Sequence, residues 1–196
     1  MKSLIFKITF PLLTAAFLLA GCQDDKAREK ATEQALEKPS TPAATAPASP
    51  STPATVGSLP LSISNKTASK GSEACVTVTA RNFNQIVSMQ YTMKWDKDVL
   101  KFKGLQGFNL PGLGADNFGK NHTDQGLLTY SWYDANVRGI SRPDNANLYD
   151  VCFEVIGGPG SKSFVEFANA PTIIEIANVN SEFLDLDGKA GIVEVK

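Results

Sequence analysis

The stretch IVSMQYTMKWDKDVLKF (residues 86–102) is the starting point for interpreting the whole chain. Large apolar residues occupy every second position from Val87 to Trp95, and polar residues occupy the positions between them. Because successive side chains of a β-strand point to opposite faces, this alternation predicts a strand with one buried and one exposed face. Residues 96–98 are turn-forming, and the apolar run from Val99 predicts a second strand, so we expect the chain to fold back on itself here.

The same kind of pattern continues to the C-terminus. Short apolar segments are separated by Gly, Pro and Asp, and no segment has a convincing helical period. Many short alternating strands predict an all-β sandwich or barrel, and 42% hydrophobic residues are enough to form its core. The predicted strands are residues 59–65, 73–81, 87–95, 99–104, 127–134, 148–156, 163–168, 173–178 and 192–196.

Three segments of this region resemble strands of the cohesin family, in the order that the family has them. In the first, the family has an aromatic residue followed by an Asp and, after a short gap, by Val-Leu; here these are Trp95, Asp96 and residues 99–100. The second, LLTYSWYDA (127–135), ends in aromatic-aromatic-Asp, and the third, LYDVCFEVIG (148–157), has a Phe-x-Val core. The resemblance implies a nine-stranded jelly-roll β-sandwich, a fold shared with some carbohydrate-binding modules. It also implies a non-catalytic module, since cohesins are best known for binding dockerin modules.

The N-terminus has the pattern of a secretory signal. An apolar segment at residues 4–20 has basic residues near its start and is followed by acidic residues, which argues against a permanent membrane span. Its end, LAGC, resembles the lipobox of bacterial lipoproteins. The resemblance implies a signal peptide at residues 1–21 and a lipid such as palmitate on Cys22. Gln23 replaces the Asp that retains such proteins at the inner membrane, which favours the outer membrane. An ordinary signal peptide with an incidental cysteine is the alternative.

Residues 22–56 are predicted to be a lipidated cysteine followed by a disordered tether, and residues 57–196 the folded domain. The run PSTPAATAPASPSTPAT within the tether contains five prolines among Ala, Ser and Thr. Such a segment cannot bury enough apolar surface to offset its chain entropy and is expected to be extended and solvated. Fully extended, it would hold the domain roughly 100 Å from the membrane. A processing remnant without a spacing role is the alternative.

The two remaining cysteines, Cys75 and Cys152, are predicted to form a disulfide. In ACVTVTA and LYDVCFEV each cysteine lies on the strand face opposite to the neighbouring valines. Two thiols on the same kind of face, in a chain exported to an oxidising compartment, suit a bond between neighbouring strands. The alternative, free or metal-binding thiols, lacks further Cys or His at ligand spacing.

The composition provides little support for catalysis or for nucleic-acid binding. The formal net charge is -1, and no basic stripe is interleaved with aromatic residues. The single histidine, His122, lies among polar loop residues without a recognisable nucleophile or orienting acid. GGPGSKS (157–163) lacks the spacing of a phosphate loop and leads into a strand, so a hairpin turn is expected. No enzyme and no cofactor are predicted.

Three pairs of acidic side chains are candidates for catalysis. The pairs are Asp96 with Asp98, Asp134 with Asp150, and Asp185 with Asp187. They could serve glycoside hydrolysis in principle, but no pattern marks them, and acids are common in turns. The alternating carboxylates of DLDG (185–188) are weak candidates for structural calcium, since the other ligands of an EF-hand are missing, and a plain turn is the main expectation.

The expected partner-binding face consists of the outward side chains of the predicted strand 87–95: Ser88, Gln90, Thr92 and Lys94. In cohesins this strand helps to bind dockerin, with Asn and Asp at the positions of Ser88 and Gln90. The resemblance therefore implies a protein partner but poor binding of the usual dockerins, since a neutral amide forms weaker hydrogen bonds than a carboxylate. Binding through the loops around residues 108–118 is a further possibility.

Carbohydrate binding in polysaccharide breakdown is the alternative function. Tyr133 is then the outward aromatic side chain, whereas Trp95 and Trp132 are expected in the core.

Overall fold

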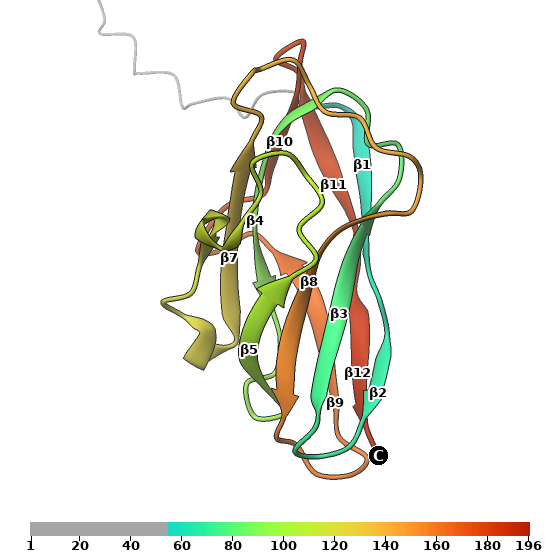
Figure 1. Cartoon of the computed structure of the whole chain (residues 1–196), viewed down its shortest axis with the longest axis vertical. Coiled ribbons are helices and arrows are strands. Elements are labelled where there is room, and N and C mark those ends of the chain that lie inside the picture. Colours follow the sequence, from blue (N-terminus) through green and yellow to red (C-terminus); the bar gives the residue numbers. More distant parts are fainter. Residues whose placement is uncertain (1–54) are drawn as a thin grey trace, which may run out of the picture. The chain divides into compact units, whose positions relative to one another are not determined.

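A computed structural model of the chain describes residues 55–196. This part contains twelve strands and two single turns of 3-10 helix (Figure 1). They are β1 (Thr55–Ile63), β2 (Lys66–Ala68), β3 (Glu73–Ala80), β4 (Ile86–Lys94), β5 (Leu100–Gln106), η1 (Ala115–Asn117), β6 (Phe118–Gly119), η2 (Thr123–Gln125), β7 (Leu127–Tyr133), β8 (Ala146–Val155), β9 (Lys162–Ala168), β10 (Glu175–Asn178), β11 (Phe183–Lys189) and β12 (Gly191–Val195). No helix within this range is long and apolar enough to cross a membrane. All nine predicted strands are present, whereas β2, β6 and β11 were not predicted.

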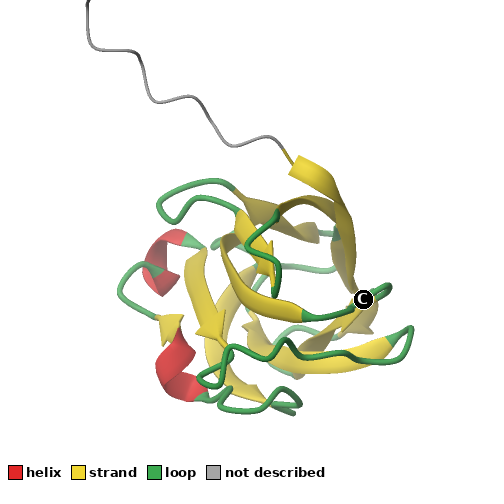
Figure 2. Ribbon diagram, turned by 90° about the horizontal axis from the view of Figure 1, so that it is seen from above, coloured by secondary structure: helices red, strands yellow, loops and turns green. Residues whose placement is uncertain are grey.

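The strands form an all-β sandwich around a common interior (Figure 2). One layer has the order β11-β1-β3-β8-β5, in which β1 and β11 run parallel. The other layer is organised around β4. On one edge β4 pairs with β7, and on its other edge it pairs with β10 along its first half and with β9 along its last three residues. Because the two layers cover each other, the apolar faces of β1, β3, β4, β7 and β8 are largely buried, whereas that of β11 is only partly buried.

The apolar alternation that predicted β4 is present from Met89 onward, whereas Val87 is only partly buried and Ile86 takes the buried position at the start of the strand. Met89, Tyr91 and Met93 are almost completely buried, as are Trp95 and Trp132, which confirms both tryptophans as core residues. Each indole finds a backbone acceptor, as buried Trp side chains usually do. Nε1 of Trp95 donates to the carbonyl of Leu100 at 2.9 Å, and Nε1 of Trp132 donates to the carbonyl of Pro111 at 2.8 Å.

Two predicted hairpins are instead connections between the layers. The chain does not fold back on itself after β4, since β5 pairs with β8 in the opposite layer. The turn at residues 96–98 makes the crossing, and the Asp96 carboxylate accepts the N–H of Asp98 at 2.9 Å. The segment 157–163 likewise connects β8 to β9, which do not pair with each other. The residues that form a turn do not determine which layer the next strand joins. Whether that strand pairs in the same layer or crosses to the opposite one, its apolar face is buried.

The DLDG segment is a strand, not the turn that was expected. It lies within β11, where Asp185 and Asp187 are exposed and alternate with the partly buried Leu184 and Leu186. This is the period-two pattern of a half-buried strand. The two acidic residues therefore occupy the outward positions of a strand, although acidic residues are also common in turns.

Candidate partner-binding surfaces

The first candidate surface is the outer side of the sheet at β7, β4 and β10, here called the polar face. It is formed by Ser88, Gln90, Ser131, Tyr133 and Glu175. The strand register places Gln90 between Ser131 and Glu175, and Ser88 beside Tyr133. The side chains surround a shallow hollow of about 70 Å³. The polar face is therefore a nearly flat surface of small polar groups, with one large exposed ring at its end.

Two of the four side chains predicted for this surface do not contribute to it. Thr92 is completely buried, which corrects the expectation that it is solvated. Its hydroxyl donates to the carbonyl of Thr172 at 3.0 Å and accepts the Thr172 N–H at 3.0 Å, because the segment between β9 and β10 folds over it. Lys94 is exposed, but its ammonium group pairs with Glu166 at 2.9 Å. Only Ser88 and Gln90 of the predicted row remain in the polar face.

The exposed aromatic side chains do not form a platform for stacking sugars. Tyr133 is outward and 67% exposed, as its position in the strand predicted. Phe164 on β9 is 57% exposed and was not singled out from the sequence. Tyr133 pairs with Ser88 near the start of β4. Phe164 lies two residues from Glu166, which pairs with Lys94 at the end of β4. From Ser88 to Lys94 the strand is about 20 Å long, so one short glycan does not reach both rings.

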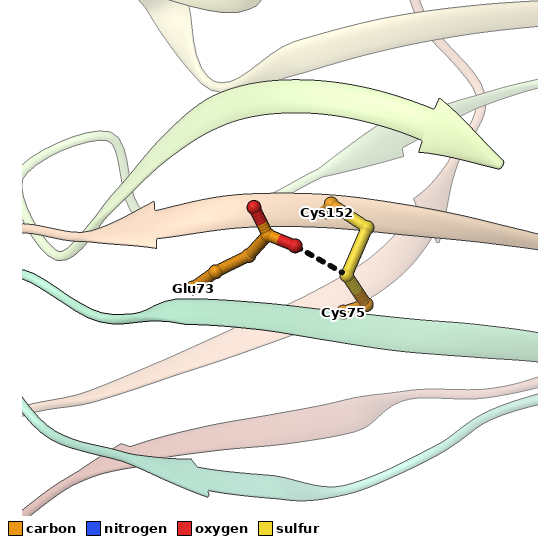
Figure 3. A group of neighbouring side chains, drawn as sticks. All are labelled: Glu73, Cys75 and Cys152. Atoms are coloured by element: carbon orange, nitrogen blue, oxygen red, sulfur yellow. Dashed lines mark hydrogen bonds between the residues drawn. A yellow bond between two sulfur atoms is a disulfide. The ribbon is translucent and has the colours of Figure 1, made fainter.

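The disulfide joins the two neighbouring strands for which it was predicted (Figure 3). Cys75 of β3 lies directly opposite Cys152 of β8, with their Cα atoms 3.9 Å apart. A carboxylate oxygen of Glu73 lies 3.5 Å from Sγ of Cys75, a contact without a donor because a disulfide sulfur carries no hydrogen. These three residues are the one close group of potential metal ligands within residues 55–196. Since both sulfurs are bonded to each other, the group is a cross-link and does not offer thiolates to a metal.

Asp134 is a structural carboxylate and not a general base. It is 3% exposed, and its carboxylate accepts the N–H groups of Asn136, Arg138 and Gly139 at 2.9 to 3.1 Å. These backbone hydrogen bonds lower the pKa of Asp134 and outweigh the opposing effect of desolvation. All three donors come from the loop that follows β7. The carboxylate therefore fixes that loop, and three of its acceptor positions are occupied by backbone N–H groups.

The other sequence candidates for chemistry are separate surface groups. His122 precedes η2 at the surface, and its Nδ1 lies 3.3 Å from Nε2 of Gln125. Asp98 binds the neighbouring Lys97 at 2.8 Å. Asp185 accepts the hydroxyl of Thr55 at 2.8 Å. Cys22 lies outside the described residues.

A second candidate surface, here called the edge groove, was not predicted from the sequence. It opens between β10 and β11 and has a volume of about 520 Å³. Its floor contains Ile174, Leu184 and Leu186, which pack partly against the core. Its rim contains Glu175 and Asp185, both exposed. The sequence signal for this groove is the alternation of apolar and acidic residues in β11, where a turn was predicted.

Comparisons with known proteins assign the fold. Protein-family models and curated proteins give no match. Among solved structures, a type I cohesin of Clostridium thermocellum in complex with a dockerin has a TM-score of 0.59 at 16% identity, covering 71% of this chain and 100% of that one. The domain has a cohesin-type fold.

Two further structures support this assignment. The sixth cohesin of scaffoldin B from Acetivibrio cellulolyticus, in complex with a dockerin variant, gives a TM-score of 0.59 at 20% identity over 71% of this chain and 99% of that one. A non-cellulosomal cohesin from Archaeoglobus fulgidus gives 0.56 at 17% identity over 71% and 92%. In each case the match spans nearly the whole of the other chain.

Proposed function

We propose that this protein is a non-catalytic binding protein of the cell envelope, whose cohesin-type domain captures a protein partner on the polar face. The observation that carries the proposal is the flat arrangement of Ser88, Gln90 and Ser131 on a sheet in which β4 is paired on both edges. Preformed flat surfaces with satisfied backbones suit docking of a folded partner, because little is lost in ordering them. The similar cohesins of C. thermocellum and A. cellulolyticus were crystallised with dockerins.

The partner is expected to differ from the usual dockerins. At the two positions where cohesins carry Asn and Asp, this chain has Ser88 and Gln90, so the carboxylate of the Asp is replaced by a neutral amide. A charge-assisted hydrogen bond is roughly twice as strong as a neutral one, so a dockerin that relies on that Asp loses much of its affinity here. Glu175 beside Gln90 supplies a carboxylate from a different strand, at a different position in the face.

Capture of the partner from the same organism, followed by its identification and a titration with the purified pair, tests this proposal. Gln90→Arg places a bulky charge at the centre of the polar face and should reduce affinity by at least tenfold with an unchanged fold. Gln125→Arg is the matched control, because Gln125 is exposed on η2 and lies outside the face. Equal affinity of the wild type, Gln90→Arg and a second variant, Ser88→Arg, would exclude the polar face as the binding site.

We further propose that Cys22 carries the lipid anchor, in the outer membrane, and that the segment after it tethers the domain. The tether was predicted to extend to residue 56, but β1 begins at Thr55, so the proposed tether is residues 23–54. An acylated cysteine gains about 0.8 kcal/mol for each buried methylene, so several chains hold a protein firmly. Replacing Cys22 by Ser should move the protein out of the membrane fraction and prevent incorporation of labelled palmitate. Membrane association that is equal in the Cys22→Ser variant and in the wild type contradicts the anchor.

Binding of a polysaccharide is the second candidate function, and the exposed ring of Tyr133 on the polar face favours it. Sugar recognition depends on aromatic stacking, so Tyr133→Ala should abolish signals on a glycan array, whereas Gln90→Arg should affect them less. The protein-binding proposal predicts the opposite order. A glycan array on which no sugar binds the wild type removes this alternative.

A further inference from the structure

The edge groove lies where two strands of the sandwich separate. β10 and β11 form a pair at Ala177 and Phe183, and beyond this pair no further residues of the two strands are opposite each other. At the other end the groove closes again, because Gly188 approaches β9 so closely that an added Cβ would lie 2.7 Å from Cδ2 of Phe167. The open part of β11 is therefore residues 184–187. It is about 13 Å long at the usual rise of a strand.

Both walls of the groove present backbone that lacks a strand partner among residues 55–196. β11 pairs with β1 on one edge, and its other edge is paired only at Phe183. β10 pairs with β4 on one edge, so Glu175 and Ile176 have their other edge toward the groove. A free strand edge is a template for one more strand, and natural proteins use it to bind extended peptides.

The side chains along the open edge alternate in character. Leu184 and Leu186 belong to the floor, whereas Asp185 and Asp187 are exposed on the outer side. Neither of these carboxylates, nor that of Glu175, forms an ion pair with a lysine or arginine of the described region. By contrast, five other acidic residues in the same region pair with lysines, namely Glu73, Asp98, Glu154, Glu166 and Glu194. The groove thus combines an apolar floor with an acidic rim whose carboxylates form no ion pair within the described residues.

We propose that the edge groove binds an extended peptide segment of another protein, in which apolar side chains alternate with Lys or Arg. A strand added to β11 places alternate side chains on opposite faces. Its inward residues would contact Leu184 and Leu186, and its outward residues would lie beside Asp185 and Asp187, where opposite charges stabilise cross-strand pairs. This is a second site with its own occupant. It shares Glu175 with the polar face but does not depend on capture there.

The experiment uses the full-length chain in detergent micelles and a fluorescent eight-residue peptide in which Val alternates with Lys, with both ends blocked. Fluorescence anisotropy should show saturable binding, and hydrogen exchange should slow at the amides of residues 184–187. The variant Asp185→Lys/Asp187→Lys should weaken binding by about tenfold or more, since two attractive cross-strand pairs become repulsive. Asp116→Lys/Asp124→Lys, at exposed acids of η1 and η2, is the matched control and should bind like the wild type. Peptides with Glu in place of Lys, or Ser in place of Val, should not bind.

Several results would overturn the proposal. These are a peptide that does not bind, one that binds the Asp185→Lys/Asp187→Lys variant as tightly as the wild type, and protection that appears outside β10 and β11. Two other occupants have their own signatures. If the chain's own residues 23–54 fill the groove, residues 184–187 are protected without peptide and lose this protection when 23–54 are deleted. If a second copy fills it, the protection rises with protein concentration. None of these measurements involves Gln90. A groove that does not bind the peptide can therefore be distinguished from a polar face that does not bind a protein partner.

Discussion

The hydroxyl oxygens of Tyr91 and Tyr149 lie 2.7 Å apart in the centre of the sandwich, so one hydrogen bond connects β4 in one layer with β8 in the other. Tyr149 in turn donates to Sδ of Met93 at 3.4 Å, which makes Tyr91 the donor to Tyr149. Tyr130 packs against both rings, with centroids 4.7 Å from Tyr91 and 5.3 Å from Tyr149. Its own buried hydroxyl has no hydrogen-bond partner in the described part of the protein.

The tyrosine pair should behave as one unit. Tyr91→Phe removes the donor and leaves the Tyr149 hydroxyl buried with only a weak sulfur acceptor, which should lower the free energy of unfolding by about 1–2 kcal/mol. Replacing both by Phe removes both polar groups together and should cost less than the sum of the single changes. Chemical denaturation of the two single variants and the double variant measures this. Strictly additive effects would show that the two hydroxyls do not interact.

Tyr130→Phe should have the opposite sign. It deletes a buried hydroxyl without a protein partner and keeps the ring that packs against Phe118 at 5.1 Å. The variant should gain about 1 kcal/mol in the free energy of unfolding, since an unsatisfied buried polar group is costly. The same denaturation series provides the measurement. A loss of stability comparable to that of Tyr91→Phe would mean that this hydroxyl is hydrogen-bonded after all.

The three buried tyrosines make the domain sensitive to alkali. Burial raises the pKa of Tyr91, Tyr130 and Tyr149 well above 10.0, with smaller effects of the neighbouring tyrosines. Because the unfolded chain releases these protons at lower pH than the fold does, their contribution to stability is complete below pH 10 and is lost as the pH rises toward the raised values. Unfolding measured from neutral to strongly alkaline pH should show this loss. Stability that is flat through this range would contradict the burial of the three rings.

Asp134 should produce the opposite dependence in acid. Its pKa is lowered from 3.8 by the N–H groups of Asn136, Arg138 and Gly139. The stabilising contribution is therefore complete above the unfolded pKa and is lost as the pH falls through the lowered pKa of the fold. Asp134→Asn should be less stable than the wild type at neutral pH, and the difference should shrink in acid. A difference that stays constant down to strongly acidic pH would assign the effect to altered packing.

The disulfide should account for a large part of the stability. The bond between Cys75 and Cys152 spans 77 residues of sequence, and the chain-entropy model gives a loss of about 4 kcal/mol when such a loop is opened. Cys75→Ala/Cys152→Ala should unfold at correspondingly lower denaturant concentration, and reduction of the wild type should have a similar effect. Mass spectrometry of non-reduced peptides provides the check. Separately alkylated peptides of the two cysteines would contradict the bond.

The alternation of apolar and polar residues determined the class of fold and most of the core. It located all nine predicted strands, buried Trp95 and Trp132 and left Tyr133 outside, because the side-chain period of a strand is a local property of the backbone. The same alternation predicted that the side chains of Cys75 and Cys152 leave the same kind of strand face, and the structure joins them in a disulfide. In each case the information lies within a few consecutive residues.

Only the tertiary structure decided which strands are neighbours, and the candidate surfaces depend on that. Thr92 lies at an outward position in the alternation of β4 but is buried, because the segment before β10 covers it. The turn after β4 leads to the opposite layer, and β11 pairs with β1 from the far end of the sequence. The edge groove exists because β10 and β11 part after a single pair of residues. Pairing of this kind is settled by the packing of the whole core, which joins residues distant in sequence, so no local pattern encodes it.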